Sequence, residues 1–147
     1  MAKINLGNLN NKILLNDEDL TKTAEIAMSF LKKDKFEVNI TFVSSNKMRA
    51  LNKKYLNQNY ATDVLAFNSE DFLHNKQRAK FFGDIIICPE TAKKNCVTFG
   101  TVFEDEIRLY VIHGILHLAG FKDKTTEEQK LMRKKENELL QKISKNI

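Results

Sequence analysis

Two histidines, His113 and His117, stand four residues apart in the stretch HGILHLAGFKDK, which begins at residue 113. Side chains four residues apart are neighbours on one face of an α-helix, so both imidazoles can face a single ion. Gly120 ends the apolar stretch and lets the chain turn back, which brings the carboxylate of Asp123 within reach. A His/His/Asp set with one position left for water is a pattern typical of catalytic zinc. We therefore predict a metal site at His113, His117 and Asp123.

The alternative is a pair of histidines satisfied by hydrogen bonds alone, because HxxxH is a short pattern. The apolar surroundings favour the metal, since an imidazole on a buried helix costs free energy unless something pairs with it. Gly114 occupies the position at which zinc proteases carry their glutamate base, and this argues against a protease. Lys122 and Lys124 beside the turn instead favour a phosphate-bearing substrate. The ion itself could be zinc or nickel.

The spacing of apolar residues indicates which elements position these side chains. Two-residue alternation and short β-rich runs predict strands at 3–6, 36–42, 63–67 and 81–88. Helical spacing predicts helices over 17–33, from 45 onward, over 89–97, over 104–119 and from 125 onward. We expect an α+β domain in which about five helices pack on a small mixed β-sheet, a zincin-like arrangement with the histidine helix buried at its centre.

Polar residues mark where the helices should begin. The expected caps are Asn16 or Asp17 for the first helix, Ser45 for the second, and a capping box of Thr125 and Glu128 for the last. Pro89 suits a first helical turn, and Gly100 should end that helix. The hydrophilic loop over 68–80 contains the third histidine, His74, which we interpret as a surface residue.

The length and composition restrict the class of protein. A chain of 147 residues with 42% apolar and 29% charged residues predicts one domain over 1–147 and argues against disorder. It carries no signal-peptide layout and no stretch near the roughly 20 apolar residues of a membrane span, so we expect a cytoplasmic protein with no membrane partner. Cys88 and Cys96 should be free thiols. The formal charge of +5 favours an anionic partner such as nucleic acid.

Three motifs in order, TDVLAF at 62–67, FGDIIIC at 82–88 and HGILHLAGF at 113–121, give the chain a resemblance to the YbeY family of bacterial metalloproteins. LNKKYL at 51–56 and a last helix with Met132 and Glu136 extend it over most of the chain. The resemblance implies an endoribonuclease in ribosomal RNA maturation and ribosome quality control. It also implies a compact α+β fold, one zinc ion on three protein ligands, and a cleft near the sheet for single-stranded RNA.

The chain departs from the family pattern at several positions. Asp123 stands where the family has its third histidine, and Phe121 and Lys122 replace a Tyr-Asp pair. Leu56 replaces an arginine that the resemblance assigns to the RNA phosphate, and Ala61 and Ala66 replace a proline and a serine. Leucine cannot supply the planar charge of a guanidinium. The positive charge must then come from Lys53, Lys54, Lys122 or Lys124, or catalysis is weak or lost.

Thr62, Asp63 and Asp84 also match the family motifs. A Thr-Asp pair before a strand commonly bonds backbone amides in a turn, so we expect a structural role for Thr62 and Asp63. Asp84 should open its strand, either as a cap or as a residue that supports a metal ligand. The sequence assigns no side chain as catalytic, and a zinc-bound water would be the nucleophile or an electrostatic participant.

Three functions are compatible with these residues. The leading hypothesis is a zinc-dependent endoribonuclease that acts on ribosomal RNA, associated with the small ribosomal subunit and with a ribosomal protein or GTPase. The second is a noncatalytic ribosome-associated factor in which the metal holds the turn after the histidine helix to the core, and Leu56 favours it. A zinc protease comes third.

Overall fold

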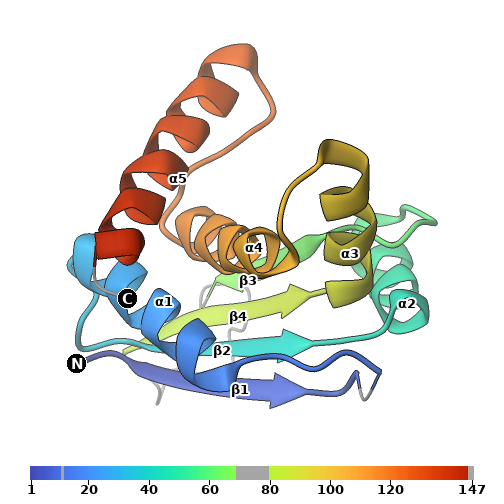
Figure 1. Ribbon diagram of the computed structural model, residues 1–147, viewed down its shortest axis with the longest axis horizontal. Coiled ribbons are helices and arrows are strands. Elements are labelled where there is room, and N and C mark those ends of the chain that lie inside the picture. Colours follow the sequence, from blue (N-terminus) through green and yellow to red (C-terminus); the bar gives the residue numbers. More distant parts are fainter. Residues whose placement is uncertain (11, 69–79, 146–147) are drawn as a thin grey trace.

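A computed structural model of the chain describes residues 1–10, 12–68 and 80–145, and Figure 1 shows its architecture. His74, which the sequence predicts to be a surface residue, lies outside these ranges. The described elements, in chain order, are β1 (Lys3–Asn8), α1 (Asp17–Phe30), β2 (Glu37–Phe42), α2 (Ser45–Leu56), β3 (Val64–Asn68), β4 (Phe81–Ile87), α3 (Pro89–Phe99), α4 (Phe103–Leu118) and α5 (Thr126–Lys145). Five helices and four strands in these ranges confirm the predicted α+β class.

The four strands form one mixed sheet in the order β1-β2-β4-β3. β1 pairs with β2 in parallel, β2 pairs with β4 in parallel, and β3 lies antiparallel to β4 at the edge. Parallel neighbours require a crossover, and α1 provides it between β1 and β2. In Figure 1, α1, α3 and α4 lie over one face of the sheet, α5 rises beyond them, and α2 lies at the end to which β2 and β4 point.

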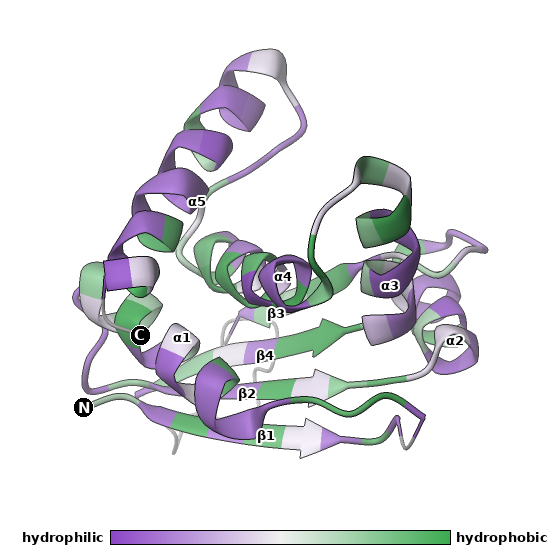
Figure 2. Ribbon diagram, viewed as in Figure 1, coloured by the Kyte–Doolittle hydropathy of each residue, from purple (hydrophilic) through white to green (hydrophobic). Residues whose placement is uncertain are grey.

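The main core lies between this helical face and the sheet. β2 and β4 alternate, so that Val38, Ile40, Ile85 and Ile87 are fully buried against the helices. α4 is the central helix, and the fully buried part of its surface comprises Val111, Ile112, Ile115 and Leu116. Figure 2 shows hydrophobic residues on α4 and on parts of the strands below it, whereas α5 is hydrophilic along much of its length. The histidine helix is therefore central and largely buried, as predicted.

The opposite face of the sheet is more polar and carries a second, smaller cluster. Asn5, Asn39 and Asp84 lie side by side on β1, β2 and β4 and form a polar row. The amide of Asn5 donates to Asn39 Oδ1 at 2.9 Å, and the amide of Asn39 donates to Asp84 Oδ1 at 2.9 Å. Next to this row, Met48 of α2 and Leu65 of β3 belong to one small buried apolar cluster. Asp84 is thus the fourth residue of β4, and the expectation that it opens the strand was wrong.

Most predicted boundaries hold, with some exceptions that have local causes. Asn16 caps α1, but this helix ends at Phe30 because Lys32 adopts a left-handed backbone with φ of 58°. Ser44, and not Ser45, caps α2 by accepting from the amide of Lys47 at 3.2 Å. The capping box is present, since Thr125 and Glu128 each accept from the amide of the other, at 3.1 and 2.9 Å.

Two helices differ slightly in length from the prediction. α3 continues two residues beyond Val97, to Phe99, before Gly100 with φ of 67° ends it. α4 runs from Phe103 to Leu118, and the left-handed Gly120 with φ of 101° follows. Both cysteines are free thiols, as predicted. Across the described ranges, no helix combines the length and the apolar character that crossing a membrane requires.

Candidate metal centre

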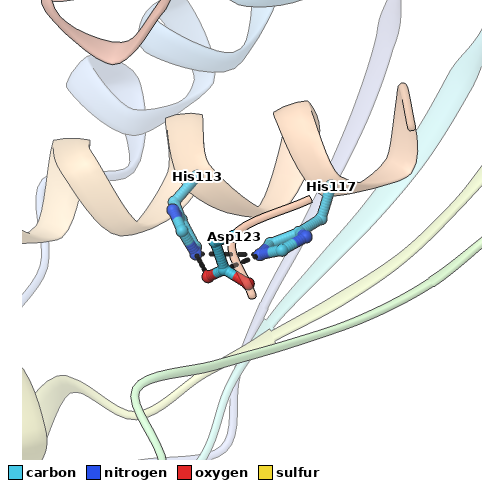
Figure 3. Close-up of side chains that lie close together, drawn as sticks. All are labelled: His113, His117 and Asp123. Atoms are coloured by element: carbon cyan, nitrogen blue, oxygen red, sulfur yellow. Dashed lines mark hydrogen bonds and ion pairs between the residues drawn. The ribbon is translucent and has the colours of Figure 1, made fainter. Parts of the chain in front are cut away.

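The three predicted ligands meet at the end of α4. His113 and His117 lie one helical turn apart, and the chain after Gly120 returns so that Asp123 lies beside them, as Figure 3 shows. The Nε2 atoms of the two rings are 2.9 Å apart, and each is 3.4 Å from Oδ2 of Asp123. In the described ranges, these residues form the group of histidine, cysteine or acidic side chains whose ligand atoms are close enough to hold one metal ion.

The geometry of this donor set fits a tetrahedral ion. Two ligand atoms that are each about 2.05 Å from a tetrahedral metal lie about 3.3 Å from one another. The histidine to aspartate distances of 3.4 Å match this value, and the 2.9 Å between the rings needs only a small opening. Two imidazoles and one carboxylate are ligands that zinc accepts. The side chains of His113, His117 and Asp123 are 21%, 28% and 41% exposed, so solvent can reach a further coordination position.

Glu136 on α5 supports the first ligand, and sequence reasoning assigned it no role. Its Oε2 accepts from Nδ1 of His113 at 2.7 Å. An ionised carboxylate only accepts hydrogen bonds, so Nδ1 carries the proton and Nε2 presents a lone pair to the site. This contact joins residues 23 apart in the sequence, on two helices. Only the position of Glu136 on the inward side of a predicted helix could have indicated it.

The surroundings shift the pKa values of the two histidines in opposite directions. Burial lowers the pKa of His113, but the hydrogen bond and charge of Glu136, together with the charges of Asp63 and Asp123, more than offset this and raise it. For His117, burial and then the charge of His113 lower the pKa, and Asp123 only partly opposes them. His113 is therefore the ligand for which protons compete most strongly with a metal.

Gly114 explains how α4 approaches the sheet beside the ligands. A Cβ atom at this position would lie 2.6 Å from Cγ2 of Ile85 and 3.2 Å from Cγ1 of Val64. The residue next to His113 thus faces the sheet, and a glutamate there would collide with the core. The packing of this helix against the sheet therefore requires glycine at the position where zinc proteases carry their glutamate base.

The structure places the other candidate residues in different surroundings. Asp63 Oδ1 accepts from the backbone amide of Val64 at 2.8 Å and from the hydroxyl of Thr62 at 3.2 Å, the turn bonding that the sequence predicted. Lys122 and Lys124 are exposed on both sides of Asp123. Lys53 and Lys54 are exposed in the last turn of α2. Asp84 belongs to the polar row on the opposite face of the sheet.

With this geometry established, comparison with known proteins identifies the family. The sequence profile described as Endoribonuclease YbeY matches residues 5–144. The chain belongs to the YbeY family. The family consists of endoribonucleases, which are hydrolases that act on RNA, so the predicted resemblance and enzyme class are confirmed.

Relatives named Endoribonuclease YbeY and one solved structure align over most of the chain. Endoribonuclease YbeY of Christiangramia forsetii is 35% identical over 137 residues, covering 93% of this chain and 92% of the relative. The protein of the same name from Aquifex aeolicus is 35% identical over 132 residues, covering 88% and 85%. The solution structure of TM1509 from Thermotoga maritima superposes with a TM-score of 0.63 at 32% identity, covering 99% of this chain and 93% of that one.

Proposed function

We propose that this YbeY-family chain is a zinc-dependent endoribonuclease that cuts single-stranded RNA during ribosomal RNA maturation and ribosome quality control. The observation that carries the proposal is the convergence of His113, His117 and Asp123 in a chain of an endoribonuclease family. Its setting would be the cytoplasm, at the small ribosomal subunit, with recruitment by a ribosomal protein or GTPase. The formal charge of +5 supports an RNA partner.

Each residue of the site then has a physical task. A divalent ion bound there supplies Lewis acidity and stabilises the negative charge that develops at an attacked phosphodiester. His113 and His117 hold it from a rigid, buried helix, and Asp123 closes the set from the turn after Gly120. Glu136 keeps the His113 lone pair directed at the ion. Lys122 and Lys124, which flank Asp123, bring positive charge to the RNA phosphates.

The second candidate is a noncatalytic factor whose metal only fixes the turn at Asp123 to α4. Leu56 favours it, because an exposed leucine ends α2 where the resemblance expects a phosphate-binding arginine. The exposed lysines on either side of Asp123 favour the nuclease, since they add positive charge to the turn that carries the third candidate ligand. The two proposals differ in whether RNA is cut, not in whether metal is bound.

A metal titration combined with an RNA cleavage assay tests the proposal. The wild-type chain should bind one zinc ion and cut single-stranded ribosomal RNA, and a chelator should abolish cleavage. Asp123→Ala should lose metal affinity and cleavage together, whereas the exposed Asp34→Ala should change neither. Equal cleavage by wild type and Asp123→Ala would refute the catalytic site. Metal binding without cleavage would favour the noncatalytic factor.

A further inference from the structure

A groove of about 500 Å³ lies between α2 and the polar face of the sheet, away from the metal ligands. Its walls are mostly apolar, with Leu51 and Tyr55 from α2 and Phe67 and Ile86 from the sheet. Lys47 and Asp84 also line it, and among the described residues Asp84 is the carboxylate in this lining. Concave, largely apolar sites with a few oriented polar groups are typical of binding sites for small ligands or single residues of a polymer.

The polar row holds the carboxylate of Asp84 in a fixed orientation. The carboxamide of Asn39 donates to Asp84 Oδ1 at 2.9 Å, while its own oxygen accepts from Asn5. Asn5 also donates to Glu37 at 2.6 Å, so the chain of hydrogen bonds crosses three strands. A carboxylate offers about four acceptor positions. Within the described part of the chain, Asn39 uses one of them, and Oδ2 remains available to a ligand.

Tyr55 supplies an aromatic surface at the same groove. Its side chain is 53% exposed, although its ring packs edge-on against Phe67 with centroids 5.2 Å apart. The ammonium group of Lys54 lies 5.2 Å from the centre of the Tyr55 ring, and Lys47 lines the groove itself. An exposed aromatic ring next to lysines is a combination that binds single-stranded nucleic acid, through base stacking and phosphate contacts.

We propose that this groove holds one guanine base of the bound RNA, selected by Asp84; this inference rests on the proposed RNA-cleaving function. Guanine presents two adjacent donors, N1–H and N2–H, which match the two oxygens of a carboxylate. Adenine and cytosine present one amino group beside an acceptor nitrogen that a carboxylate repels, and uracil presents a single donor between two carbonyls. Tyr55 stacks on the base, and Lys47 and Lys54 bind the flanking phosphates.

The groove and the metal ligands lie on opposite sides of the strand pair β3 and β4. Gly83 faces the end of α4 so closely that a Cβ there would lie 2.6 Å from Cδ2 of Leu118, the neighbour of His117. Asp84, the next residue, points to the opposite face. Because β3 is the edge strand, an RNA strand that passes around it contacts both sites. Cleavage then falls at a fixed number of nucleotides from the guanine.

Binding of short RNAs tests the inference separately from cleavage. The probes are heptamers of uridine with guanosine, inosine or adenosine at the central position, measured by fluorescence anisotropy with a chelator present so that no RNA is cut. Wild type should bind the guanosine heptamer about 10- to 100-fold more tightly than the adenosine one. Inosine, which lacks the N2 amine, should lie between them. Asp84→Asn should remove the difference between guanosine and inosine.

Two further variants control for charge and for folding. Asp34→Asn makes the same charge change at an exposed site outside the groove and should keep the full preference for guanosine. Asn39→Ala leaves Asp84 in place without its positioning bond and should reduce the preference, so it serves even if Asp84→Asn does not fold. Equal binding of the three heptamers by wild type, or a preference that survives in Asp84→Asn, would overturn the inference.

Cleavage measured with metal present separates this inference from the proposed function. A preference for guanosine in binding, together with cleavage at a constant distance from the guanosine, supports both. Cleavage by wild type with no preference in binding refutes the guanine site and leaves the nuclease proposal standing. A preference in binding with no cleavage supports the guanine site and refutes the nuclease.

Discussion

Oε2 of Glu136 on α5 accepts a hydrogen bond from Nδ1 of His113 on α4 at a distance of 2.7 Å. The side chain of Glu136 is only 14% exposed, so the contact is shielded from solvent screening. It fixes the tautomer of His113 and ties α5 to the helix that carries two candidate ligands. The candidate site thus extends beyond the three side chains that face the ion, as is usual for histidine ligands of metals.

We expect Glu136→Gln to weaken metal binding. The amide keeps an oxygen that can accept from Nδ1, but it loses the charge that makes His113 a stronger ligand, so the affinity for zinc should fall about 10- to 100-fold. Competition with a coloured chelator measures this. Glu138→Gln is the matched control, because Glu138 forms an ion pair with Lys135 on the surface of the same helix and should change affinity less than about twofold. Equal losses in the two variants would contradict the role of Glu136.

The contact between α4 and the sheet gives a second prediction. Gly114→Ala forces a methyl group against Ile85 and Val64, and overpacking of this kind should lower the free energy of unfolding by about 1–3 kcal/mol. Gly7→Ala is the control, because the nearest atoms to a Cβ there are about 3.9 Å away and its backbone needs no positive φ. Urea unfolding of the metal-free proteins measures both. A Gly114→Ala protein as stable as wild type would show that α4 can move away from the sheet.

The ligands and the supporting residues differ in how far the sequence could predict them. His113, His117 and Asp123 lie within eleven residues, and the helix repeat with the turn at Gly120 determines their relative positions. Glu136 lies on another helix, and its approach to His113 depends on how α5 packs against the domain, which no local pattern encodes. The local sequence predicts that Asp84 lies at a strand end, but the register of β4 against β2 places it opposite Asn39 in the middle of the strand.

The N-terminal cap of α2 is another feature that local sequence could not decide. Ser44 and Ser45 are adjacent and either could cap α2 on sequence grounds. Ser44 takes that role, because the hydroxyl of Ser45 donates to Glu90 Oε2 at 2.6 Å across to the start of α3. A tertiary contact therefore decided between two equivalent local choices.

The bond between Ser45 and Glu90 makes stability depend on pH. The hydrogen bond from the Ser45 hydroxyl is the largest cause that lowers the pKa of Glu90 below its ordinary 4.5. A carboxyl with a depressed folded pKa stabilises the fold above its unfolded pKa, and this contribution is lost as pH falls through the folded pKa. Ser45→Ala should therefore cost about 1 kcal/mol at pH 7, and less at pH values below the folded pKa of Glu90.

Urea unfolding at several pH values measures this difference. Ser44→Ala is the matched control, because its cap bond to the amide of Lys47 involves no titrating group and its cost should stay constant as Glu90 is protonated. If the cost of Ser45→Ala were independent of pH, the depressed pKa of Glu90 would have another origin.

The position that separates the two proposed functions is Leu56, which is 52% exposed at the end of α2 beside Lys53 and Lys54. Leu56→Arg should strengthen binding of single-stranded RNA, and one added phosphate contact should steepen the slope of log affinity against log salt by about 0.7.

Leu131→Arg is the matched control, since Leu131 is a similarly exposed leucine (48%) on α5. It adds the same charge, and its salt slope should stay at the wild-type value. Equal steepening in both variants would mean that any added charge attracts RNA, and Leu56 would then mark no phosphate site. Faster cleavage in Leu56→Arg alone would show that the leucine limits a working nuclease.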